Sequence, residues 1–388
     1  MSGHTTFCEI NLDNIAFNYE TVCRYVAPSE VIPVLKGNAY GHGAVALARV
    51  LVEMGCRHLT VAKLTEASQL RKAGIDTSKV DLIIMTAMLP DEIDMAISIN
   101  ASFFVPDFRT LDYLRKVGNR QAWPPRFHIK VDTGMGRMGF MPEEGHAVAM
   151  ALKSLKGCKL EGFATHLCAA GEDSEQNQRQ LERFDAFLAG VNPPDGCLIH
   201  MASSSAVCRF PEMFKSAVRV GDLIYGLCGV DNPPFELRPA LSCVTRVIQV
   251  KSLPPGWHVG YGARQWVRTP MTTATISMGI VDGMMSSQVN RGCVLVNGRR
   301  CRLLAACADT AIIDVSDAGG VEPGDNVVYI GSQGSERITA REQAIAAGTG
   351  FNELLSKISL RTPRVYCRKG KYAGEMSLGR MDGIAALN

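Results

Sequence analysis

The first two thirds of the chain alternate short apolar runs with longer amphipathic stretches. Eight of these runs have the length and the β-branched or aromatic content that is typical of buried strands. Helical spacing of apolar residues follows several of them, for example Leu181, Phe184 and Phe187 within 176–189. The predicted strands cover residues 31–36, 59–63, 81–86, 102–105, 126–132, 159–165, 197–201 and 217–220.

Eight strands that are each followed by a helical stretch predict an α/β fold, the (β/α)8 TIM barrel. An open, doubly wound sheet is the alternative that the same pattern allows. After Pro233-Pro234 the strands follow one another closely, and turn signals such as Asn297-Gly298 separate them. We therefore expect a barrel over residues 1–235 and a mostly antiparallel β-domain over 236–388. The strands predicted for that second domain are 244–251, 272–278, 293–296, 302–306, 311–315 and 326–330.

Composition narrows the class of protein. The chain has 388 residues, of which 46% are hydrophobic and 20% charged, as in a packed globular protein. A net charge of +3, with scattered basic residues, gives no reason to expect nucleic acid as a partner. The thirteen cysteines form no C-x-x-C pair, so we expect reduced thiols and no metal site. Because no secretion signal or membrane-spanning run is seen, a cytoplasmic protein without membrane contact is expected.

Reactive residue types fall where the predicted barrel strands end, and barrel chemistry is found at those ends. Lys36 ends the first apolar run, and a lysine desolvated there has a lowered pKa and a neutral amine that can form a Schiff base. A snorkelling lysine at a strand end is the alternative. The run Ser203-Ser204-Ser205, together with Gly221, could bind a phosphate, although a serine run is also typical of a solvated loop. A Schiff-base lysine and a phosphate cradle at one barrel mouth suggest pyridoxal phosphate.

Four blocks of sequence, in order, resemble the alanine racemase family, and the similarity runs from about residue 6 to about residue 366. The first is the lysine signature Lys36–Gly43, and the second is Lys130–Gly139. The third runs from His200 through Ser204, Arg219 and Gly221 to Gly226. The fourth, Val259-Gly260-Tyr261-Gly262-Ala263, opens the second domain.

The resemblance implies a fold-type III enzyme with pyridoxal 5'-phosphate and a small amino-acid substrate. Lys36 would hold the cofactor and act as the base on the D-side of the substrate. Tyr261 would be the base on the L-side, reaching in from the partner subunit of a head-to-tail homodimer. Racemisation needs two opposed proton carriers, because a planar carbanion must be reprotonated from the face opposite to deprotonation. A tyrosine needs help to act as a base because its ordinary pKa is near 10, and His166 would supply that help with Arg219.

The remaining roles also follow from the resemblance. Arg219 would face the pyridine nitrogen, and it holds its protons too tightly to give one up. Arg137 would contact the cofactor's phenolic oxygen and the substrate carboxylate. Lys130 would be carbamylated and hold Arg137 in place; an ordinary Lys130–Asp132 pair is the alternative. The phosphate contacts would come from Tyr40, Ser204 and the backbone amides at Gly221 and Asp222.

The chain departs from the family pattern at several positions. Ile280 replaces a usual tyrosine, Leu360 replaces the tyrosine that narrows the entrance and touches the phosphate, and Ala308 replaces a methionine beside the substrate-site residue Asp309. Ser203 and Gly37 stand where asparagine and alanine are usual. Because three groups near the mouth are smaller or lack a hydroxyl, we predict an enlarged pocket.

Alanine is the default substrate, and the alternative is a racemase for serine or a larger amino acid. Two further interpretations were weighed. A decarboxylase of the same architecture is disfavoured because its glycine-triplet phosphate loop and C-terminal cysteine motif are missing. A non-catalytic paralogue that binds pyridoxal phosphate is disfavoured by the retention of Lys36, Arg137, His166, Arg219 and Tyr261.

Overall fold

The computed structural model describes residues 3–119, 123–172, 174–263 and 265–378. The chain divides into two compact units, and each is described by itself. One unit consists of Asn14–Ala39 and Leu47–Arg238. The other consists of Met1–Asp13, Tyr40–Ala46 and Pro239–Asn388. In the described part of the chain, no helix combines the length and the apolar character that crossing a membrane requires.

The first unit is built on an eight-stranded parallel sheet with the strand order β2-β9-β8-β7-β6-β5-β4-β3. The sheet closes on itself, because Val34 bridges Thr60 and the Leu35 N–H donates to the Thr60 carbonyl at 2.7 Å. The predicted barrel is therefore confirmed, and the open-sheet alternative is wrong. The strands are β2 (Glu30–Pro33), β3 (His58–Val61), β4 (Asp81–Ile84), β5 (Ser102–Val105), β6 (Arg126–Lys130), β7 (Lys159–Ala164), β8 (Leu198–His200) and β9 (Ala217–Val220).

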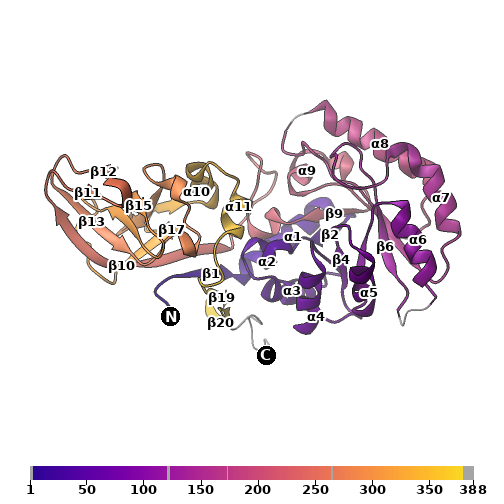
Figure 1. Ribbon diagram of the computed structural model, residues 1–388, viewed down its shortest axis with the longest axis horizontal. Coiled ribbons are helices and arrows are strands. Elements are labelled where there is room, and N and C mark those ends of the chain that lie inside the picture. The colour runs from indigo at the N-terminus through magenta and orange to yellow at the C-terminus, as the bar shows by residue number, and fades with distance from the viewer. Residues whose placement is uncertain (1–2, 120–122, 173, 264, 379–388) are drawn as a thin grey trace. The chain divides into compact units, whose positions relative to one another are not determined.

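Helices surround these strands, as the purple and magenta ribbons of Figure 1 show. Two of these helices have a side chain that caps the N-terminus. Asp107 accepts a hydrogen bond from Thr110 N at 2.8 Å, and Ser174 accepts one from Gln176 N at 3.1 Å. The helices are α1 (Leu12–Val26), α3 (Ala44–Glu53), α4 (Leu64–Lys72), α5 (Pro90–Ser98), α6 (Phe108–Val117), α7 (Gly145–Lys153), α8 (Glu175–Val191) and α9 (Ser204–Arg209).

The second unit is built on a ten-stranded sheet with the order β18-β17-β14-β15-β16-β13-β10-β1-β19-β20. Most neighbours in it are antiparallel, but β1 pairs in parallel with β19. Two helices, α10 (Ala340–Ala347) and α11 (Phe351–Ser356), belong to the same unit. The strands are β1 (Phe7–Asn11), β10 (Leu241–Leu253), β13 (Met271–Ile276), β14 (Cys293–Val296), β15 (Arg299–Ala306), β16 (Ala311–Asp314), β17 (Asn326–Gln333), β18 (Glu336–Ile338), β19 (Arg364–Arg368) and β20 (Lys371–Met376). A separate hairpin joins β11 (His258–Val259) to β12 (Gln265–Trp266).

Candidate active site

The segment that follows β2 is a left-handed turn. Lys36 opens it, and Gly37, Asn38 and Ala39 have φ angles of 62°, 54° and 55°. Tyr40 continues the turn with φ 47°. A left-handed conformation costs a non-glycine residue about 1–2 kcal/mol, and strain of this kind is found where a site needs a fixed geometry. The turn holds Lys36 at the carboxyl end of a barrel strand, as the sequence predicts.

Glu66, in the first turn of α4, anchors the turn around Lys36. Its carboxylate accepts hydrogen bonds from Gly37 N at 2.6 Å, Ala62 N at 2.8 Å and Lys63 N at 3.0 Å. The same side chain therefore caps α4 and holds the backbone next to Lys36. Sequence reasoning missed this residue.

The environment of Lys36 favours its neutral amine. Burial lowers the pKa of Lys36, and the positive charges of Arg137 and Arg219 lower it further against the opposing effect of Asp222. A neutral lysine amine is a nucleophile and a base, whereas the ammonium is neither. The geometry therefore places a reactive amine at the barrel mouth.

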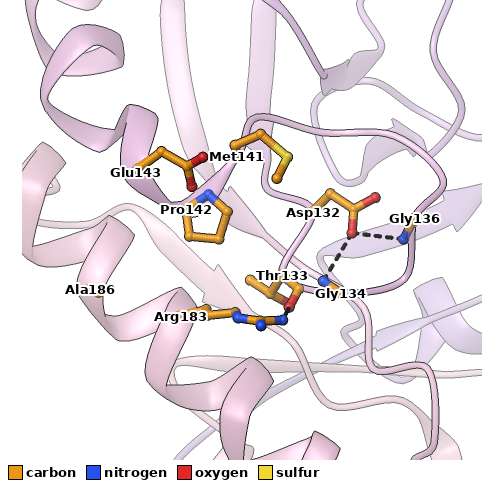
Figure 2. A pocket seen from close by; sticks show the side chains of 9 residues that line it. All are labelled: Asp132, Thr133, Gly134, Gly136, Met141, Pro142, Glu143, Arg183 and Ala186. Atoms are coloured by element: carbon orange, nitrogen blue, oxygen red, sulfur yellow. Dashed lines mark hydrogen bonds between the residues drawn. The ribbon is translucent and has the colours of Figure 1, made fainter.

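A second loop, after β6, is organised around Asp132. Four backbone N–H groups, from Gly134, Met135, Gly136 and Arg137, donate to its carboxylate at 2.7–3.0 Å. Partial burial opposes ionisation, but these four hydrogen bonds hold the pKa of Asp132 below its ordinary value. Figure 2 shows two of the four bonds and the tight path that they impose on the loop. Asp132 therefore orders the loop.

A cavity of about 650 Å³ lies between this loop and α8. Arg183 of α8 points toward the loop and donates to the Thr133 carbonyl at 2.9 Å (Figure 2). The residues that line the cavity include Met141, Pro142 and Ala186, but neither Lys36 nor Arg219. The cavity is therefore distinct from the site around Lys36.

Lys130, the last residue of β6, is 3% exposed, and its ammonium donates to the Val131 carbonyl at 2.6 Å. Burial lowers the pKa of Lys130 from 10.5 to about 7, and the charge of Arg219 adds to the effect. The Lys130 amine therefore loses its proton far more readily than the amine of an exposed lysine.

Arg219, from β9, lies at the centre of a buried chain of nitrogen atoms. Its Nη2 lies 3.2 Å from His166 Nδ1, and its Nη1 lies 2.8 Å from His200 Nδ1. His200 Nε2 in turn lies 3.1 Å from His128 Nδ1. A guanidinium can only donate, so both imidazoles must accept at Nδ1 and carry their proton on Nε2. His200 then donates to His128, which also carries its proton on Nε2.

These three imidazoles are neutral. Burial, followed by the charge of Arg219, lowers the pKa of His166 and of His200 well below the ordinary value. Burial lowers the pKa of His128 to about 4. Burial also lowers the pKa of Arg219 to about 10, with a further effect of Arg137, and the guanidinium stays charged at neutral pH. Arg219 is therefore a fixed, permanently protonated group.

Gln180, on α8, connects the loops after β6 and β7. Its amide nitrogen donates to Thr133 Oγ1 and to the His166 carbonyl, both at 3.0 Å. Its amide oxygen accepts from Cys168 N at 2.9 Å. Gln180 is fully buried, and its bonds to the His166 carbonyl and to Cys168 N fix the backbone that follows His166.

The loops after β8 and β9 meet at Ser204 and Gly221. Gly221 N donates to the buried Ser204 hydroxyl at 3.1 Å. Ser204 begins α9, and Gly221 precedes the short 3-10 helix Asp222–Tyr225. Backbone N–H groups at two helix starts therefore lie close to one hydroxyl, which is a suitable arrangement for binding an anion.

Cationic groups outnumber anionic ones around these loops. The positive charges of Arg137 and Arg219 lower the pKa of both Lys36 and Lys130. Positive charges that depress one another in this way are relieved when an anion binds. The first unit thus brings together Lys36, Arg137, Lys130, His166, Ser204, Arg219, Gly221 and Asp222, all predicted from the sequence.

The other predicted residues lie in the second unit. Tyr261 begins a 3-10 helix at 261–263, and its side chain is 80% exposed. Ile280 N donates to the Cys307 carbonyl at 2.9 Å, and Val281 N donates to the Ala308 carbonyl at 3.0 Å. Ile280 therefore lies beside Ala308.

Arg361 ties together three segments of the second unit. Its guanidinium lies 2.9 Å from Asp282 Oδ1 and 3.0 Å from Asp309 Oδ1. Leu360, the residue before it, is 38% exposed. Arg364, which is 1% exposed, donates to the Gly41 carbonyl at 2.7 Å, one residue after Tyr40. The predicted residues Ile280, Ala308, Asp309 and Leu360 thus occupy one connected surface.

Two family models match the chain. "Alanine racemase, N-terminal domain" covers residues 10–228, and "Alanine racemase, C-terminal domain" covers 240–366. An alanine racemase of Carboxydothermus hydrogenoformans is 37% identical over 93% of this chain and 99% of its own length. The chain belongs to the alanine racemase family.

Solved structures of the family agree with the fold. An alanine racemase of Clostridium difficile superposes with a TM-score of 0.90 at 27% identity, covering 97% of this chain and 99% of that one. An alanine racemase of Bartonella henselae with covalently bound pyridoxal phosphate has a TM-score of 0.86 at 26% identity, covering 94% of this chain and all of that one. Members of the family are pyridoxal-phosphate enzymes.

Three supporting residues were not predicted: Glu66, Gln180 and His128. Glu66 carried a detectable signal, because an acidic residue three positions after a helix N-cap is typical of a capping box. Gln180 and His128 had none, because each acts through contacts with residues distant in sequence.

Proposed function

We propose that this chain is a pyridoxal-phosphate-dependent amino-acid racemase with alanine as its default substrate. The observation that carries the proposal is Lys36, an amine at the mouth of a barrel whose pKa is lowered by burial and by two guanidinium groups. Its place in the alanine racemase family supports the same reading.

The residues of the first unit fit pyridoxal phosphate, because an excess of positive charge surrounds one reactive amine. Lys36 would hold the cofactor's aldehyde carbon, and Arg219 would face the ring nitrogen. Ser204, Gly221, Asp222 and Tyr40 would hold the phosphate. When bound, the cofactor withdraws electrons from the amino acid's α-carbon and thereby weakens its Cα–H bond.

Two residues would move the α-proton. Lys36 would take it from, or return it to, the D-face of the α-carbon, and Tyr261 would do the same on the L-face. The 80% exposure of Tyr261 within one protomer fits a side chain that serves a partner subunit. We accordingly propose a head-to-tail homodimer in which domain 236–388 of one subunit completes the barrel, domain 1–235, of the other.

The other groups would set charge and position. Arg219 keeps its proton, so it would donate a hydrogen bond without delivering a proton to the cofactor. His166, protonated at Nε2, would have that N–H available for the phenolic oxygen of Tyr261. Arg137 would bind the substrate carboxylate, and Ala308 and Asp309 would line the substrate side from the partner subunit. An enlarged substrate range, based on Ile280, Ala308 and Leu360, stays a prediction.

One experiment tests the reaction itself. The protein is incubated with pyridoxal phosphate and either L- or D-alanine in deuterated water. We expect deuterium at the α-carbon together with loss of optical purity from both substrates. Release of carbon dioxide would point to a decarboxylase, and absence of both changes would point to a binding protein. Parallel runs with serine, lysine and arginine measure the substrate range.

Lys130 is expected to make the protein's stability depend on pH. Its pKa is 10.5 in the unfolded chain and about 7 in the folded protein, so the unfolded chain binds more protons between these values. The free energy of unfolding should therefore rise as the pH rises from 7 to 10, and the cost of burying the ammonium is fully present below pH 7. Relative to wild type, Lys130→Met should be more stable by roughly 3–5 kcal/mol at pH 6, and the gain should vanish near pH 10.5.

Urea unfolding in buffer free of carbon dioxide checks this, with Lys116→Met on the exposed side of α6 as the control. A gain that does not change with pH would contradict the prediction. Dissolved carbon dioxide adds a second arm, because the neutral amine can form an N–C bond with it and release a proton. The resulting carbamate is an anion beside Arg219 and Arg137, so carbon dioxide should stabilise the wild type and leave Lys130→Met unchanged.

Ser204→Ala is expected to weaken cofactor binding. The substitution removes the hydroxyl that accepts from Gly221 N and that would contact the phosphate. Loss of one or two hydrogen bonds corresponds to an affinity for pyridoxal phosphate about tenfold lower. Titration of the apo-protein with pyridoxal phosphate measures this, and Ser205→Ala, on the next residue, is the matched control. Equal affinities of the two variants would argue against Ser204 as a phosphate ligand.

A further inference from the structure

Two cysteines of the first unit lie side by side. Cys208, near the end of α9, and Cys228, in the segment after the 3-10 helix Asp222–Tyr225, have their sulfur atoms 3.6 Å apart. Both side chains are half-buried, so a small reagent can reach them. The pair is remote in sequence, and the fold alone brings it together.

The two thiols lie on the same segments as the proposed phosphate site. Ser204 opens the helix that carries Cys208 one turn later, and its hydroxyl accepts from Gly221 N at 3.1 Å. On the other side, Leu227 N donates to the Asp222 carbonyl at 2.9 Å and so ties the residue before Cys228 to the start of the 3-10 helix. Movement of the backbone at Cys208 or at Cys228 therefore acts directly on the segments that carry Ser204 and Asp222.

The chemistry of the pair gives the two sulfur atoms different roles. A hydrogen bond to Cys228, together with burial, raises the pKa of the Cys208 thiol. A thiolate is the form that attacks a disulfide, so the exchange is proposed to begin at Cys228, the partner of the thiol whose pKa is raised.

A second close pair serves as a comparison. Cys8 and Cys243 are cross-strand partners of β1 and β10 in the second unit, but both are fully buried in its sheet. Reagents in solution do not reach them in the folded protein. At Cys208 and Cys228, in contrast, the two sulfur atoms are close together and both residues are partly exposed to solvent.

We propose that Cys208 and Cys228 are a dithiol site that forms a reversible disulfide by exchange with a low-molecular-weight disulfide, and that this bond lowers the affinity for pyridoxal phosphate. The second half of the statement rests on the proposed function, and the first half does not.

The exchange balances in two steps. The Cys228 thiolate attacks one sulfur of the small disulfide, a protein–reagent disulfide forms, and one small thiolate leaves. The Cys208 thiol loses its proton to solvent, its sulfur attacks the sulfur of Cys228, and the second small thiolate leaves. The protein gives up two electrons and two protons, and the small disulfide becomes two thiols.

Formation of the Cys208–Cys228 disulfide must shift the backbone or the side chains around the proposed phosphate site. Disulfide sulfur atoms are about 2.0 Å apart, so the present 3.6 Å separation has to shorten by about 1.6 Å. A six-residue helix that begins at Ser204 cannot easily absorb this movement within itself. We expect the Ser204 hydroxyl and the Gly221 amide to separate, with an affinity for pyridoxal phosphate about tenfold lower.

The test uses the full-length protein in mixtures of reduced and oxidised glutathione. Peptide mapping by mass spectrometry without reduction should find a peptide that links Cys208 to Cys228, and dithiothreitol should remove it. Cys208→Ser and Cys228→Ser should lose this species, whereas Cys168→Ser, which removes an exposed thiol, should keep it. Oxidised and reduced apo-protein are then titrated with pyridoxal phosphate.

The possible outcomes test disulfide formation and its effect on cofactor affinity separately. If only glutathione adducts form, or if Cys8 and Cys243 are linked instead, the dithiol site is refuted, and this result on the wild type does not depend on how the variants fold. If the link forms and the affinity for pyridoxal phosphate is unchanged, the effect on the cradle is refuted. If the reduced protein binds no pyridoxal phosphate, the proposed function fails, while the mapping still decides whether the disulfide forms.

Discussion

Lys36→Ala should abolish covalent attachment of pyridoxal phosphate and lower the racemisation rate by about 10³-fold or more. The variant removes the amine at the mouth of the barrel whose pKa is lowered by burial, by Arg137 and by Arg219. Borohydride reduction followed by mass spectrometry locates the cofactor on the wild-type chain, and a chiral assay with L- and D-alanine gives the rates. The mass of cofactor should appear on the peptide that contains Lys36.

The matched control is Lys63→Ala. Lys63 follows β3 much as Lys36 follows β2, but its side chain is exposed to solvent. The two variants therefore compare lysines at neighbouring strand ends that differ in environment. Cofactor attached to Lys63 or elsewhere, or a Lys36→Ala enzyme with wild-type rate, would overturn the proposed site.

The apolar pattern was sufficient to predict the barrel. Each of the eight predicted runs overlaps a strand of the closed sheet, and the bounds of β5 and β9 agree with those predicted. Buried parallel strands read as continuous apolar runs, so periodicity and length find them directly. Several predicted strands extended too far at their carboxyl ends. Lys36 and Asp132, for example, lie in loops whose first residues are apolar.

Short elements at the two ends of the chain were not predicted. β1 is five residues long, lies at the start of the chain, and pairs with β10 and β19 far along it. β18, β19 and β20 and helices α10 and α11 were missed for the same reason or because they are short. Strand pairing is decided by contacts across the sheet, which the local sequence does not encode.

In the candidate site, too, some features could be predicted from the sequence and others could not. Residues such as Lys36, Lys130 and Arg219 stand out because their type is unusual at a strand end. The left-handed turn after Lys36 and the fixed tautomers from His166 to His128 become evident only from the structure. Both depend on where donors and acceptors meet in space. Because the Arg219 guanidinium can only donate, it decides which nitrogen of His166, His200 and His128 carries the proton.

Tyr261→Phe should separate proton removal on the two faces of the substrate. If Tyr261 serves the L-face, the variant loses exchange of the α-proton of L-alanine, while Lys36 still exchanges that of D-alanine without inverting it. Racemisation in both directions should fall by about 10²- to 10⁴-fold, because each direction uses both groups. Proton NMR in deuterated water measures exchange, and Tyr372→Phe, on a 60% exposed tyrosine of β20, is the control. Loss of exchange from both enantiomers, or from neither, would contradict the assignment.

Mixing two inactive variants tests whether the tyrosine acts across subunits. In a dimer of one Lys36→Ala chain and one Tyr261→Phe chain, an arrangement across subunits leaves one site with both wild-type groups. An arrangement within one chain leaves no complete site. Unfolding and refolding the variants together should therefore restore about a quarter of wild-type activity, because half of the dimers are mixed and each has one working site. Recovery that stays at the level of the separate variants would show that Tyr261 does not complete the partner's site, since neither barrel would then have gained a second proton carrier.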